Sequence, residues 1–226
     1  AHGIAKLSKF DDRKHVEITP ENGHIRVACS NGYQTLWAKC DCITKGSGTT
    51  AVPVEAIDEM LKAASSSMLI RVFDNAIAYN SGSLSLESSI RADSKLVTPM
   101  IPRVMESHRK PDSPSAIVDR IELINAIKSA DSVSQKRAIP SVKVEIDIAK
   151  TVVSCDNSET SVTSDVPADT IGATSFRFAA SDIVGTLSKM SSEKVCIEHH
   201  PDSPAAWFSP YGDENILIAV QIIRNE

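Results

Sequence analysis

The feature that most constrains this chain is an internal duplication. Val16–Ile18 in the first half matches Val144–Ile146 in the second half, and His24–Cys29 matches Thr151–Cys155. Each of these segments has the alternation of apolar and polar residues that is typical of a half-buried strand. The two copies are offset by about 126–128 residues, a period long enough for a whole domain. The sequence therefore predicts two tandem copies of one α+β unit.

The second copy is the more complete of the two. It begins with a predicted strand and helix over 115–134, in which Asp119 is the expected N-cap and Glu122 follows three residues later. In the first copy, the residues before Val16 leave no room for such a pair. We therefore expect the first copy to lack its initial strand and helix, so that residue 1 lies inside a domain.

The same pattern predicts where the copies end. The first domain is expected over 1–104 and the second over 115–226. Between them, the residues 105–114 combine proline, serine and charged side chains, which is typical of a linker.

Composition excludes several classes of protein. The chain has 226 residues, 42% of them hydrophobic and 23% charged, which is ordinary for a globular protein. No apolar stretch approaches the ~20 residues of a membrane helix, and no signal peptide is visible. The five cysteines are an odd, scattered set, which favours free thiols in a reducing cytoplasm. The net charge of −5 does not indicate an obvious nucleic-acid binder.

No motif in the sequence indicates catalysis. Gly46-Ser47-Gly48 lacks the Lys-Ser/Thr of a phosphate-binding loop, and the sequence has no Gly-x-Ser-x-Gly nucleophile elbow. His199 and His200 lie beside Glu198 and Asp202, but their spacing matches no known metal-ligand set. We therefore predict a protein that is not an enzyme and has neither a metal site nor a cofactor.

Several segments resemble, in order, the middle and last domains of bacterial sliding clamps, the beta subunit of DNA polymerase III. The segment 27–38, with Ser30-Asn31-Gly32-Tyr33-Gln34 at a tight turn, resembles the family's Thr-Asp-Gly-His-Arg-Leu-Ala stretch. Four other segments resemble the family's Val-Ile-Val-Pro segment, its closing strand, the start of its last domain and its terminal strand: 50–54, 86–102, 119–123 and 216–223. The family's Phe-Pro-Asp-Tyr motif is absent here, and the last strand lacks its proline.

The resemblance implies a fold and a function. In this family, antiparallel sheets form the outside of a ring of six similar domains, and helices line its inner face. The ring encircles duplex DNA and acts as a replication processivity factor. It also tethers DNA polymerase and clamp-loader subunits through short peptides. The resemblance thus implies a homo-oligomer that needs little direct affinity for DNA.

The resemblance also implies a peptide-binding groove and a DNA-facing set. The groove would use turn residues, closing-segment residues and residues of the last strand: Gly32, Tyr33, Thr35, Leu36, Leu96, Pro99, Met100, Leu217, Ala219 and Val220. The DNA-facing cations would come from the 119–137 helix and the linker: Lys128, Lys136, Arg137, Arg109 and Lys110.

Two other readings of the sequence remain open. A clamp-fold adaptor would keep the groove without forming a ring on DNA, and the acidic helix over 54–64 favours it, because Glu55, Asp58 and Glu59 outnumber Lys62. An unrelated duplicated binding domain would show no affinity for clamp-binding peptides. Mass in solution separates a ring from an adaptor.

Overall fold

The computed structural model describes residues 14–62, 69–73, 76–81, 84–89, 96, 98–135, 139–157 and 159–223. The chain divides into two compact units, 1–101 and 102–226. Each is treated below by itself.

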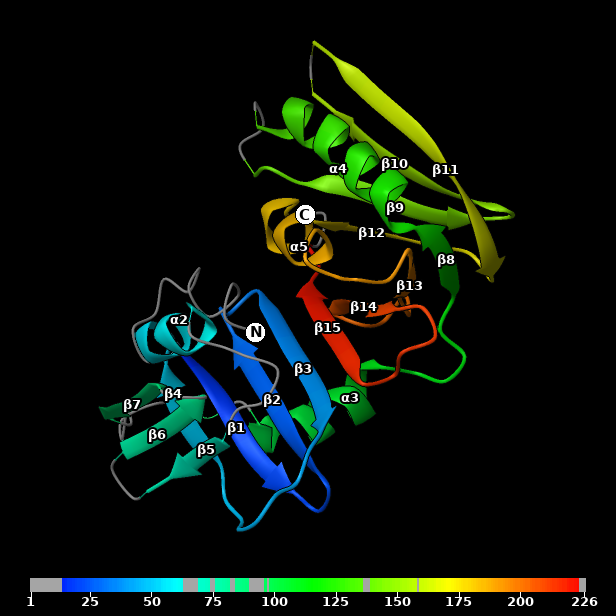
Figure 1. The fold of residues 1–226 in the computed structure, drawn as a ribbon. Coiled ribbons are helices and arrows are strands. Elements are labelled where there is room, and N and C mark those ends of the chain that lie inside the picture. Colours follow the sequence, from blue (N-terminus) through cyan, green and yellow to red (C-terminus); the bar gives the residue numbers. More distant parts are fainter. Residues whose placement is uncertain are drawn as a thin grey trace. The chain divides into compact units, whose positions relative to one another are not determined.

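Unit 1 is built from two antiparallel sheets and one helix among its described residues (Figure 1). The first sheet has the order β3-β2-β1-β4 and the second the order β5-β6-β7. The elements are β1 (His15–Glu21), β2 (His24–Ser30), β3 (Gln34–Asp41), β4 (Thr50–Pro53), α2 (Val54–Lys62), β5 (Leu69–Val72), β6 (Ala76–Ser81), β7 (Leu84–Ser89) and the short 3-10 helix η2 (Thr98–Met100).

The core of unit 1 lies where β1 and β4 meet the helix and the second sheet. Ile18, Val52 and Ile77 are buried together, and Ile57 of α2 packs against them. Strand alternation brings Ile18 and Val52 to the same face, because successive strand residues point to opposite sides of a sheet.

Helix α3 (Ile101–His108) begins at the boundary between the units, and unit 2 contains the remaining elements: β8 (Ser115–Asp119), α4 (Arg120–Ser134), β9 (Val142–Asp147), β10 (Lys150–Asp156), β11 (Ser161–Ile171), β12 (Thr174–Phe178), α5 (Ser181–Leu187), β13 (Lys194–Glu198), β14 (Ala205–Pro210) and β15 (Ile216–Gln221). Its strands follow the order β12-β9-β10-β11-β8-β13-β14-β15. Helix α4 lies across β10 and β11 (Figure 1) and buries Leu123, Ile124 and Ile127.

The two units confirm the predicted duplication. Four strands, one helix and three strands follow one another in both, from β1 to β7 and from β9 to β15. The sheet order β3-β2-β1-β4 in unit 1 is the order β11-β10-β9-β12 in unit 2. The segments that the sequence paired, such as 16–18 and 144–146, occupy equivalent strands. The expected absence of an initial strand and helix in the first copy concerns residues 1–13, which lie outside the described residues.

One sequence expectation differs from the structure in detail. Helix α3 (Ile101–His108) occupies the start of the segment expected to be a linker, and the rest of that segment is non-helical, with a turn at Pro111 and Asp112. In unit 2, strand β11 is long, with 11 residues from Ser161 to Ile171. Its alternate positions are polar on the exposed side, so the apolar signal weakens along the strand although pairing with β8 continues.

Candidate functional site

The tight turn predicted around Asn31 is present between β2 and β3. The Asn31 side-chain oxygen accepts hydrogen bonds from the backbone N–H groups of Tyr33 at 3.0 Å and Gln34 at 2.7 Å. Gly32 has a φ of 95°, a conformation that favours glycine. The side-chain oxygen of Ser30 accepts the N–H of Gly32. The turn is therefore held by its own side chains, and it leaves Tyr33 48% exposed.

The other two candidate residues beside this turn are less accessible. Leu36 of β3 is only 7% exposed. The Thr35 hydroxyl donates a hydrogen bond to the Ser30 hydroxyl at 3.1 Å, so this side chain is part of the turn's internal network. Within unit 1, Tyr33 is thus the turn side chain that is most available to a ligand.

The closing segment presents one more exposed apolar side chain. Met100, at the end of η2, is 62% exposed, whereas Leu96 is half-buried. The side chain of Pro99 lies outside the described residues. The backbone N–H of Thr98 donates to the Glu17 carboxylate at 2.6 Å.

The candidate residues of β15 fall on two faces of the strand. Leu217 and Ala219 share one face, and Val220 lies on the other, since strand faces alternate. Val220 is paired with Ala206 of β14, and both are fully buried. A single groove on one face of β15 can therefore use Leu217 and Ala219 or it can use Val220, but not all three.

The candidate DNA-facing cations differ in their availability. Lys128 of α4 and Lys110 are exposed. Arg109 instead makes two hydrogen bonds to Glu198, each at 2.8 Å, and these bonds raise the pKa of Arg109 above its ordinary value. Lys136 and Arg137 lie outside the described residues. Lys128 and Lys110 are therefore the candidates in the described part of the chain that can meet a phosphate without breaking an ion pair.

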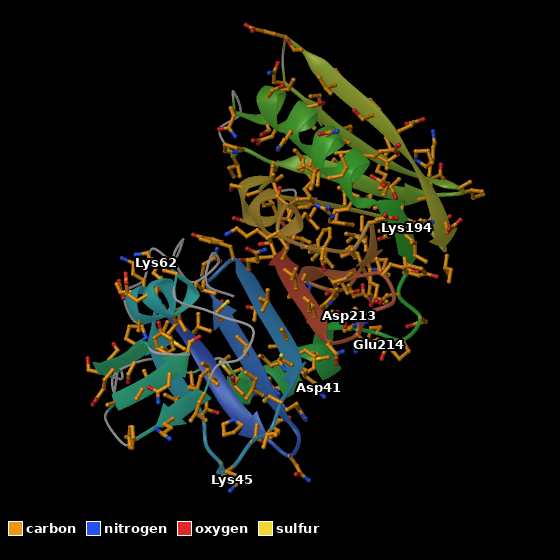
Figure 2. The ribbon with its side chains drawn as sticks, in the orientation of Figure 1. Asp41, Lys45, Lys62, Lys194, Asp213 and Glu214 are labelled. Carbon is orange, nitrogen blue, oxygen red and sulfur yellow. The ribbon has the colours of Figure 1, made fainter. Side chains whose placement is uncertain are left out.

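Helix α2 presents carboxylates rather than cations. Glu55 and Glu59 are exposed, and Lys62 at the end of the helix (Figure 2) is 2.6 Å from Glu59. Together with Glu87 of β7, these glutamates rim a cavity of about 220 Å³ whose floor includes Met60 and Tyr79. The negative charges of these three glutamates disfavour the binding of phosphate groups at this cavity.

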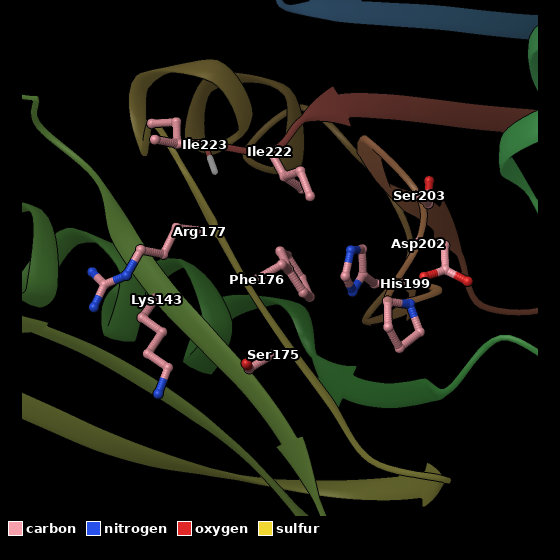
Figure 3. Close-up of a pocket in the computed structure, with 10 residues that line it drawn as sticks. Lys143, Ser175, Phe176, Arg177, His199, Asp202, Ser203, Ile222 and Ile223 are labelled. Carbon is pink, nitrogen blue, oxygen red and sulfur yellow. The ribbon is translucent and has the colours of Figure 1, made fainter. Parts of the chain in front are cut away.

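A larger cavity of about 510 Å³ lies in unit 2 beside β12 (Figure 3). His199 and Phe176 face each other there, with ring centroids 4.7 Å apart. Lys143 and Arg177 also line the cavity, but Figure 3 shows both extending away from His199. The geometry therefore does not direct these cations and the imidazole onto one ligand.

The sequence did not single out the buried pair of His15 and Glu17. Their side chains are 1% and 0% exposed, and His15 Nε2 lies 3.3 Å from the Glu17 carboxylate. The duplication aligns these positions with Lys143 and Glu145, whose side chains form an ion pair at 2.7 Å in the structure. Only the structure reveals that the first pair is buried.

The described residues contain neither a cluster of potential metal ligands nor a helix that could span a membrane. Within the described part of the chain, no group of three or more His, Cys, Asp or Glu side chains could hold a metal ion. The five cysteines are free, with Cys29 and Cys155 buried and Cys40 and Cys42 exposed. Among the described helices, none has the length and apolar character needed to cross a membrane.

Comparison with known proteins identifies the fold. Neither a protein-family model nor a curated protein matches this sequence. Among solved structures, the DNA polymerase sliding clamp of Pseudomonas aeruginosa has a TM-score of 0.86 at 14% identity, over 99% of this chain and 63% of that chain. The sliding clamp of Bacillus subtilis has a TM-score of 0.85 at 14% identity, over 100% and 61%.

A third neighbour is the C. crescentus beta sliding clamp, solved with polyethylene glycol at a region assigned to beta-motif tethering. Its TM-score is 0.82 at 15% identity, over 99% of this chain and 62% of that chain. The chain thus spans about three fifths of the length of the clamps it matches. Its fold is that of the bacterial sliding clamp, so the resemblance is confirmed at the level of the fold, with low sequence identity.

Proposed function

Proceeding from the sliding-clamp fold, we propose that this chain is part of a DNA sliding clamp, a non-enzymatic processivity factor of the cytoplasm. In this proposal, the protein forms a homo-oligomeric ring of six clamp domains around duplex DNA. It tethers DNA polymerase and clamp-loader subunits through short peptides. The observation that carries the proposal is the duplicated topology, which matches clamp structures over 98–100% of the chain.

The acidic surface is compatible with this role. A closed ring stays on DNA because it is topologically linked to it, so it requires few phosphate contacts. Lys128 and Lys110 are the exposed cations that we propose for those contacts. Lys136 and Arg137 would extend the same surface beyond α4.

The alternative is a clamp-fold adaptor that binds peptides without closing a ring. Two observations favour it. The carboxylates Glu55, Glu59 and Glu87 gather around α2, and Arg109 is neutralised by Glu198. Both reduce the attraction between a ring of such units and DNA.

The mass of the full-length protein in solution distinguishes the two. Light scattering at micromolar concentration should give a dimer if each subunit has three clamp domains, or a trimer if each has two. Either result means a six-domain ring. A monomer under these conditions would contradict the ring and leave the adaptor as the working model.

For client binding, we propose apolar residues from each unit: those of the turn and the closing segment in unit 1, and those of β15 in unit 2. The exposed apolar side chains of the unit 1 set are Tyr33 and Met100. Apolar anchors of this kind carry most of the binding energy in peptide recognition. From β15 the proposal takes Leu217 and Ala219, which are 4% and 9% exposed, and Val220 is the alternative on the opposite face of the strand.

The test is binding of a fluorescein-labelled peptide copied from the tail of a clamp-binding polymerase. Tyr33→Ala and Met100→Ala should each weaken binding at least about tenfold, the usual effect of removing an anchor. Tyr211→Ala is the matched control, because Tyr211 is 55% exposed and lies outside the proposed surface. Leu36→Asp is a poorer probe, since it buries a charge in unit 1 and would also destabilise the fold. Equal binding by wild type and both variants would contradict the assignment.

A further inference from the structure

Unit 1 contains a fully buried carboxylate that the peptide-binding proposal does not yet use. Glu17 of β1 is 0% exposed. One of its oxygens lies 3.3 Å from His15 Nε2, and the other accepts the backbone N–H of Thr98 at 2.6 Å. Burying a carboxylate is costly unless hydrogen bonds compensate it, and these contacts contribute to that compensation.

The duplication supplies an internal comparison for this position. Lys143 and Glu145 occupy the equivalent places on β9, and their side chains are 32% and 40% exposed. Both units thus have a basic residue and a glutamate two positions apart on this strand, but only in unit 1 is the pair buried. Among the described residues, Glu145 accepts no hydrogen bond that corresponds to the one from the Thr98 amide to Glu17.

Thr98 is the first residue of η2, and its N–H cannot be satisfied within that helix. The Glu17 carboxylate supplies the acceptor from β1, 81 residues earlier in the chain. At 2.6 Å, the distance from the Thr98 nitrogen to the Glu17 oxygen is at the short end of the usual range for an N–H to oxygen bond, so the two groups are in close contact. This contact holds the start of a three-residue helix whose last residue is the exposed Met100.

We propose that Glu17 is a positioning residue for client binding, because its buried carboxylate holds the Thr98 amide and thereby sets how Met100 is presented. The inference rests on the proposed peptide-binding function. Glu17 itself touches no ligand in this scheme. Its effect reaches the peptide through the backbone of residues 98–100.

The experiment uses the full-length protein with Glu17→Gln and Glu17→Leu, and Glu145→Leu as the matched control from the other repeat. Glutamine keeps the shape and an oxygen acceptor but removes the charge, whereas leucine removes the acceptor. Two quantities are measured: hydrogen exchange of the Thr98 and Met100 amides, and affinity for the fluorescein-labelled polymerase-tail peptide.

Glu17→Gln should accelerate exchange of the Thr98 amide by about tenfold and weaken peptide binding about threefold or more. Glu17→Leu should have larger effects on both. Glu145→Leu should change neither, because that carboxylate is on the surface and accepts no bond from the closing segment. A purely structural role would change the exchange rate and the melting temperature but leave peptide affinity unaltered in the folded variants.

The outcomes separate failure of this inference from failure of the proposed function. If the wild type binds no peptide, the client-binding proposal fails, and this inference, which rests on it, falls with it. If the wild type binds but Glu17→Gln alters neither exchange nor affinity, the inference alone is wrong. Faster exchange without loss of affinity also overturns it. If Glu17→Leu does not fold, Glu17→Gln decides the question by itself.

Discussion

At the scale of single residues, unit 2 depends on a buried histidine. His199 is 2% exposed and packs against Phe176. Its Nδ1 atom lies 2.9 Å from the hydroxyl oxygen of Thr174. Burial lowers the pKa of His199, and the neighbouring His200 adds to the effect, although the Ser203 backbone opposes it. The folded protein therefore holds this imidazole neutral more strongly than the unfolded chain does.

The sign of the resulting pH dependence follows from linkage. A base with a lowered pKa in the folded state binds its proton more readily in the unfolded state, so protonation favours unfolding. The contribution of His199 is present above the unfolded pKa of about 6.5 and is lost as the pH falls through the folded pKa. Melting temperatures measured between pH 7.5 and pH 5 should therefore fall more steeply for the wild type than for His199→Gln. Parallel curves for the two proteins would show that this group does not titrate with unfolding.

At the scale of elements, helix α4 is held at its start by bonds that the sequence predicted and by others that it did not. The Asp119 carboxylate accepts the N–H groups of Ile121 and Glu122, both at 2.8 Å, which confirms the predicted N-cap. Arg120 donates to the backbone carbonyl oxygens of Ser192 and Leu187, at 2.7 and 3.2 Å. Arg120 thus ties α4 to the end of α5, and it is not a free surface cation.

Removing the cap should cost a measurable part of the stability of unit 2. Asp119→Ala should lower the free energy of unfolding by about 1 kcal/mol, which is typical for the loss of an N-cap side chain. Asp119→Asn is the control, since asparagine caps about as well as aspartate. Urea denaturation followed by circular dichroism checks both. If alanine and asparagine behave alike, the two hydrogen bonds contribute little.

At the scale of the whole molecule, the charge of the chain bears on how it would be retained on DNA under the proposed function. Both units have the same sheet order, yet the chain carries a net charge of −5. A protein that held DNA by direct contact would need a dense basic surface. This chain instead offers few exposed cations on the elements for which we propose DNA contact.

Binding to a linear duplex should accordingly be weak and only mildly salt-dependent. At 0.15 M salt we expect a Kd of about 10⁻⁴ M or weaker, the weak end of non-specific binding. Lys128→Ala should reduce the slope of log K against log salt by about one unit if Lys128 meets a phosphate. Lys150→Ala is the control, because Lys150 is paired with Asp165 at 2.8 Å. Tight binding with a steep slope would contradict a topological mode of retention.

The duplication, the helix from Arg120, the turn at Asn31-Gly32 and the fold class could all be predicted from the sequence. These features depend on local periodicity and on turn and capping residues, whose preferences act within a few residues. The alternation of apolar and charged residues over Val142–Asp147 predicts a half-buried strand. The match to Val16-Glu17-Ile18 then requires only that the same short pattern recur.

Only the tertiary structure decided which of these side chains are buried and which residues they contact. Glu17 and Glu145 have the same neighbours in sequence, yet one carboxylate is buried and accepts the amide of Thr98 while the other is exposed. Arg109 is paired with Glu198, 89 residues away in the chain. Burial and pairing depend on segments distant in the chain, and no local pattern encodes which segment that will be.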